Sequence, residues 1–87
     1  MDEFSLIVLE DTLQLATEVL PSELVSDCVS GIRECVSAIA VNPCDRRSVS
    51  RLGPALNQLS HIAHEHNKFL VETRLQSIAR QFEAEVA

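Results

Sequence analysis

The sequence predicts an all-α fold: a three-helix bundle in which two shorter helices pack on one long C-terminal helix, and which dimerises into a larger helical bundle. Apolar residues recur every three or four positions over three segments, at about 3–19, 22–41 and 52–86. Two glycines and three prolines provide too little turn chemistry for the hairpins of a sandwich or barrel. The 87 residues suffice for one helical domain, 1–87, with a small core and a thin stability margin.

The first helix is expected over residues 3–19. Its apolar positions alternate between spacings of three and four, and further apolar residues widen this face on one side. The regularly spaced positions are Leu6, Leu9, Leu13, Ala16 and Leu20. A face this wide suits a helix that contacts two neighbours at once. Pro21 ends the helix, because the residue before a proline avoids helical backbone angles.

The second helix is expected over residues 22–41. Apolar pairs repeat there every three or four positions, which fits a helix better than the strict alternation of a strand. Gly31 lies in its middle at a cost of about 1 kcal/mol relative to alanine. Either it permits close approach of another helix, or it is a tolerated surface glycine. Asn42 and Pro43 mark the following turn, and 43–53 is expected to be a loop that contains at most a short helical turn.

The third helix is expected to begin near Pro54 and to continue to residue 86, because no later glycine or proline interrupts it. It would span roughly 50 Å, against about 24 and 30 Å for the first two helices. Either the first two helices cover mainly the half from Pro54 to Phe69, and the far half presents apolar side chains to a partner, or the first helix folds back to cover the rest. The apolar side chains of the far half are Phe69, Leu70, Val71, Leu75, Ile78 and Phe82. The apolar stripe slips by one residue between Leu70 and Val71, which favours a bundle over a long regular coiled coil.

This surplus of apolar surface predicts a non-catalytic protein-interaction or oligomerisation module that forms a homodimer through the long helix. The alternative is a monomeric adaptor with a groove for a partner's amphipathic helix or short motif. An enzyme is not expected, since the chain has neither a glycine-rich phosphate loop nor a nucleophile elbow. No cofactor is expected.

The charge is unevenly distributed along the chain. Residues 1–45 hold nine acids and one base, whereas residues 46–87 hold four acids and six bases, which accounts for the net charge of −6. Nucleic acid is therefore not an expected partner. A membrane is not expected either, because each apolar run falls far short of the roughly 20 residues of a spanning helix. The acidic N-terminus and three cysteines predict an intracellular, cytoplasmic protein.

Three histidines and a glutamate form the one cluster of potential metal ligands. On a helix, His61 could share a metal ion with His64 or Glu65, which would make the chain a metal-binding protein. The simpler interpretation is an ordinary surface pair of His61 with Glu65. His66 points away from His64 and is expected near the apolar seam, where its protonation would make an interface pH-sensitive.

Cysteine and serine suggest further sites. Cys28 and Cys35 share a helix face but lie about 10.5 Å apart along the axis, so we expect them to be buried thiols that do not bond each other. Cys44 is expected in the loop, exposed, and without a resolving cysteine nearby for a redox role. Ser50 follows Arg47 by three positions, which is a weak phosphorylation signal; a phosphate there would stabilise the start of the long helix.

Overall fold

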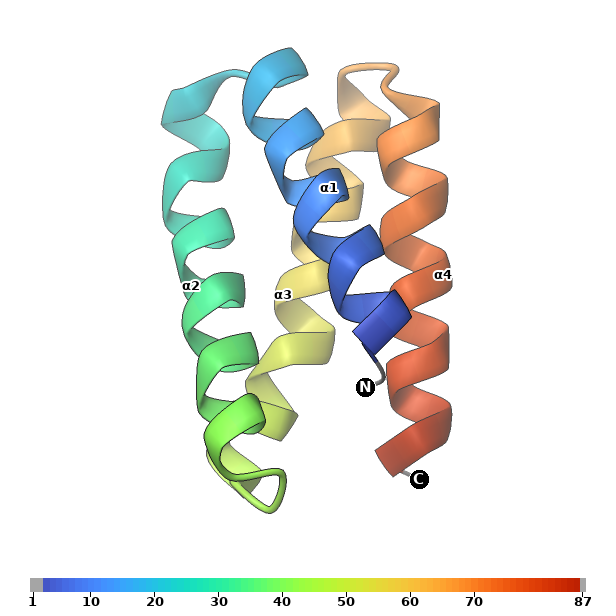
Figure 1. Ribbon diagram of the computed structural model, residues 1–87. Helices are drawn as coiled ribbons and strands as arrows, with labels where there is room; N and C mark the ends of the chain where they lie inside the picture. Colours follow the sequence, from blue (N-terminus) through green and yellow to red (C-terminus); the bar gives the residue numbers. More distant parts are fainter. Residues whose placement is uncertain (1–2, 87) are drawn as a thin grey trace.

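The structure is a computed structural model that describes residues 3–86, with side chains described as far as Glu85. It consists of four helices, α1 (Glu3–Val19), α2 (Ser22–Val41), α3 (Arg46–Glu65) and α4 (Phe69–Val86). They run alternately up and down, so that each helix is antiparallel to the next (Figure 1). No residue of the described range 3–86 belongs to a strand, which confirms the all-α prediction.

The first two helices coincide with the segments expected at 3–19 and 22–41. The amide of Leu20 still donates to the Ala16 carbonyl at 2.9 Å, and the Pro21 carbonyl accepts from Leu24 at 3.0 Å. The direction of the chain therefore reverses at Pro21. Gly31 is a tolerated surface glycine, because a Cβ built on it would meet no atom within 4 Å.

The single long helix predicted over 52–86 is wrong, and its expected start near Pro54 is also wrong. α3 begins at Arg46, because Asp45 caps it: one carboxylate oxygen accepts from the Ser48 amide at 3.3 Å and the other from the Ser48 hydroxyl at 3.2 Å. Pro54 lies inside α3, where it has no amide to donate to the preceding turn. The loop expected over 43–53 is reduced to residues 42–45.

α3 ends because Asn67 adopts a left-handed conformation, with φ at 59°. The amide of Asn67 donates to the His64 carbonyl at 3.1 Å, and the amide of Lys68 donates to the Ala63 carbonyl at 2.8 Å. These two bonds form the Schellman pattern that closes many helices, in which asparagine is the usual alternative to glycine. The slip between Leu70 and Val71 is therefore the boundary between two helices, and the fold has four helices in place of three.

The core is one cluster to which all four helices contribute. α1 packs on α2 and α4, while α3 packs on the same two helices from the other side. Figure 1 shows α1 crossing the front of the bundle, from α2 at one end towards α4 at the other. The molecule is 34 Å long, which matches a helix of about 20 residues at 1.5 Å per residue. Within residues 3–86, none of the helices combines the length and apolar character needed to cross a membrane.

Candidate interaction surface

The apolar side chains expected to face a partner are mostly covered by the chain itself. Val71, Leu75, Ile78 and Phe82 are each less than 5% exposed, because α4 folds back along α3 and beneath α1. The chain's own helices thus bury most of the apolar stripe that was predicted from the sequence to contact a partner. Phe69, at 55% exposed, and Leu70, at 59%, are the two members of that set that solvent reaches.

Phe69 and Leu70 lie at the first turn of α4 and form part of a shallow apolar surface. Leu15 and Val19 of α1 complete it, and we call these four residues the Phe69 patch. The hollow beside them has a volume of about 400 Å³ and is bordered by Asn67, Lys68 and Val71. The patch therefore joins the last turns of α1 to the start of α4.

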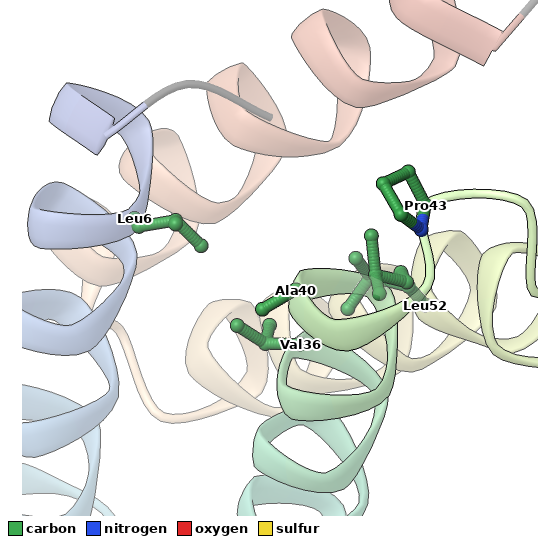
Figure 2. A pocket seen from close by; sticks show the side chains of 6 residues that line it. Leu6, Val36, Ala40, Pro43 and Leu52 are labelled. Atoms are coloured by element: carbon green, nitrogen blue, oxygen red, sulfur yellow. The ribbon is translucent and has the colours of Figure 1, made fainter.

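A second apolar surface opens at the other end of the bundle, between α1 and α2. Because α1 crosses towards α4 there, it leaves the last turns of α2 uncovered (Figure 1). The resulting pocket, which we call the α1/α2 groove, has a volume of about 310 Å³. It is lined by Leu6, Val36, Ile39, Ala40, Pro43 and Leu52. Figure 2 shows Leu6 on one side of the opening and Val36 with Ala40 on the other.

The groove continues towards the middle of the bundle. A second hollow of about 210 Å³ shares Leu6 and Val36 with it and reaches Leu13. Glu10 and Arg33 close this extension with an ion pair at 2.8 Å that links α1 to α2. Both side chains are about half exposed, so the pair contributes at most about 1 kcal/mol to stability.

The two walls of the groove come from the acidic half of the chain, whereas Leu52 at its floor follows the arginines Arg46, Arg47 and Arg51 of α3. These walls lie within residues 1–45, which hold nine acids and a single base. That base is Arg33, whose guanidinium is already paired with Glu10. Positive charges on a bound segment would therefore be attracted by the two walls and repelled by the arginines at the start of α3.

The histidine cluster is divided between two separate histidine–glutamate contacts. His61 Nε2 lies 3.0 Å from Glu65 Oε1 on the exposed face of α3, which is the simpler arrangement expected from the sequence. His64 Nδ1 instead lies 2.9 Å from Glu72 Oε2 and so links α3 to α4. Its ring also meets the ring of Phe69 edge-on, with the centroids 6.1 Å apart. No set of three or more His, Cys, Asp or Glu side chains within the described chain is grouped to hold a metal ion.

His66 does not lie on an apolar seam, contrary to the sequence-based expectation. It is exposed at the C-terminal end of α3, where its amide donates to the Ile62 carbonyl at 3.2 Å. The helical wheel that placed it near the seam does not apply, because the helix ends at this residue. A pH-sensitive interface at His66 stays a prediction, and the exposed position of this side chain does not support it.

All three cysteines are free thiols. Cys28 is partly buried, and its thiol donates to the Ala55 carbonyl of α3 at 3.3 Å. Burial raises the pKa of this thiol above its ordinary value, and the smaller opposing effect comes from the backbone at Leu59. Cys35 is buried in the core and Cys44 is exposed in the turn before α3. Cys35 and Cys44 thus have the environments expected from the sequence, whereas Cys28, expected to be buried, is only partly so.

Ser50 lies on an exposed face of α3, where its hydroxyl donates to the Arg47 carbonyl at 3.0 Å. The helix starts earlier than expected, so Ser50 is in its second turn and not in a loop. A phosphate on this side chain would lie close to the positive end of the helix and to the arginines that precede it. Phosphorylation at Ser50 stays a prediction.

Sequence reasoning missed the α1/α2 groove, because Val36, Ile39 and Ala40 all carry the signal of a buried helix face. That signal shows which face of α2 is apolar, but the crossing of α1 decides how much of it is covered. Exposed Val41 at the end of α2 was the one available hint. Comparisons with protein-family models, with curated proteins and with solved structures give no match to this chain.

Proposed function

We propose that this chain is a non-catalytic protein-interaction module that binds an apolar segment of another protein in the α1/α2 groove. The observation that supports this is a concave, mainly apolar opening of about 310 Å³ between two helices, with the buried side chain of Leu52 at its floor. Grooves between helices commonly accept the apolar face of an amphipathic helix or a short extended motif.

The expected ligand has two or three apolar side chains at helical or extended spacing, with lysine or arginine on either side. The apolar side chains would contact Leu6, Val36 and Ala40, which border the opening (Figure 2). The basic flanks would be attracted by the acidic first half of the chain, of which Glu10 lines the extension of the groove. Salt should therefore slow association more than it weakens the apolar contacts.

Peptide display on the purified chain tests this proposal. Selected peptides should share apolar residues with basic flanks, and NMR shifts on binding should centre on Leu6, Val36 and Ala40. The variant Ala40→Gln narrows the groove with a flexible polar side chain and should weaken these peptides at least about tenfold, which is 1.4 kcal/mol. Ser30→Gln places the same side chain on an exposed position of α2 outside the groove and is the matched control.

Two results would contradict the groove assignment. One is a set of selected peptides that bind wild type and Ala40→Gln equally well. The other is a set whose shifts centre on the Phe69 patch, at the opposite end of the bundle.

Self-association as a homodimer is the second candidate function, and the Phe69 patch supports it. Phe69 and Leu70 are adjacent, large and more than half exposed, and Leu15 and Val19 extend the same surface. Two copies that met through this patch would remove both side chains from water. Light scattering over a dilution series should then show a dimer that Leu70→Gln weakens, whereas Leu24→Gln, also at an exposed apolar position, leaves it unchanged.

A further inference from the structure

We propose that two copies of this chain can exchange α4. The turn at residues 66–68 straightens, α3 and α4 become one continuous helix in each copy, and each α4 occupies the place of its counterpart in the other bundle. The partner is thus a second copy of this chain. This inference rests on the self-association candidate and states how the two copies would be held together.

The α3–α4 turn is the connection best suited to straighten. The other two connections contain Pro21 and Pro43, and a proline within a continuous helix is costly because it has no amide to donate and its ring crowds the preceding turn; α3 already contains one such residue, Pro54. Residues 55–86 contain neither proline nor glycine. The turn instead depends on Asn67, which is the one non-glycine residue with positive φ in the described part of the chain. This conformation is unfavourable for an L-residue, and a straight helix would relieve it.

Besides the packing of α4 in the core, only a few local contacts hold the turn closed. They are the cap hydrogen bonds from Asn67 and Lys68, the contact of His64 with Glu72, and the edge contact of His64 with Phe69. All residues from 64 to 70 are exposed. Straightening therefore uncovers no core side chain at the turn, and it replaces the cap hydrogen bonds with regular helical ones.

Exchange keeps the contacts of the core. The buried side chains of α4, such as Leu75 and Phe82, would find in the second copy the same surfaces of α1 and α3 that they contact in their own chain. The two straightened turns would meet where the copies join. Phe69 and Leu70 lie at that junction. Both are exposed to water in the monomer, so the exchanged dimer can bury apolar area that the monomer cannot.

The test uses the whole chain, unfolded in denaturant and refolded at roughly millimolar concentration, where exchange between copies competes with closure within one copy. Light scattering after size exclusion should show a dimer. On dilution this dimer should persist for as long as unfolding of α4 takes, since exchange back requires α4 to leave the bundle.

Two substitutions of one residue provide the matched comparison. Asn67→Gly favours the closed turn and Asn67→Ala disfavours it. The dimer association constant should be at least about 25-fold larger for Asn67→Ala than for Asn67→Gly. Each dimer contains two such turns, and each turn contributes a factor of about five or more. Insertion of Gly-Ser-Gly after Asn67 lengthens the turn and should abolish the dimer while leaving the helix content by circular dichroism unchanged.

Two outcomes would overturn the proposal. If wild type and Asn67→Ala are both helical yet monomeric after refolding at high concentration, neither exchange nor self-association takes place. If a dimer forms but re-equilibrates within seconds of dilution and is equally strong in the two Asn67 variants, the copies associate through the Phe69 patch without exchanging α4.

Discussion

At the scale of single residues, Cys28 gives the molecule a predictable response to alkaline pH. Its partly buried thiol donates to the Ala55 carbonyl, and burial raises its pKa in the folded chain. The unfolded chain therefore loses this proton first as pH rises, and it is stabilised relative to the folded chain. The contribution of Cys28 to stability is fully present below about pH 8.5 and is lost as pH rises through the higher folded value.

We expect the free energy of unfolding of wild type to fall between pH 7.5 and 10, and to fall less for Cys28→Ser, whose hydroxyl keeps the hydrogen bond but does not ionise. Urea unfolding at several pH values measures this. The absence of tyrosine leaves few other groups that titrate in this range. Cys44→Ser, at an exposed position, should retain the wild-type dependence. Parallel curves for Cys28→Ser and wild type would contradict the assignment.

At the scale of helices, the start of α3 depends on Asp45. Asp45→Ala leaves the first amides of α3 without a side-chain acceptor and should lower the free energy of unfolding by about 1 kcal/mol. Urea unfolding at neutral pH provides the measurement. Asp27→Ala removes the same charge from an exposed position on α2 and should have a smaller effect. Equal losses in the two variants would show that the general charge balance, and not the cap, is responsible.

The helices also show how far a single sequence predicts this fold. Pro21 and Pro43 mark their turns clearly, because proline is costly inside a helix; Pro54, which lies within α3, shows that this signal is strong but not absolute. Asn67 gives a much weaker signal, since asparagine is tolerated within helices at a small cost and adopts the left-handed conformation only when the surrounding fold favours a reversal. Here the core favours it, as the side chains of α4 are buried against α1 and α3 once the chain turns back.

The candidate site was less predictable than the fold, for a related reason. The spacing of Val36, Ile39 and Ala40 identifies an apolar face of α2. Whether that face is covered depends on the angle at which α1 crosses it, and that angle results from packing between helices distant in sequence. A groove is the uncovered remainder of two such faces, so it has no sequence pattern of its own.

At the scale of the whole molecule, the burial of α4 distinguishes a core side chain from an interface side chain. Leu75→Ala should lower the free energy of unfolding by about 2–5 kcal/mol, because Leu75 is fully buried and the cavity would not refill. That is a large part of the stability expected for a chain of this size. Leu70→Ala should change stability by less than about 1 kcal/mol, since Leu70 is mostly exposed.

Urea unfolding of a dilute, monomeric sample of each variant checks this contrast. If Leu75→Ala had wild-type stability but altered association, Leu75 would be an interface residue, as the sequence first suggested, and not a core residue. Comparable losses in both variants would mean that the first turn of α4 is more tightly packed than its exposure indicates.

An even number of antiparallel helices brings the chain back to the end of the bundle from which it set out. α1 begins and α4 finishes on the side where the α1/α2 groove opens, whereas the Phe69 patch occupies the far side (Figure 1). A tag, dye or fused domain attached ahead of α1 or beyond α4 will therefore stand at the same end of the bundle as the groove. A reporter coupled to Lys68 stands beside the Phe69 patch instead, so that labelling by these two routes separates events at the two ends of the molecule.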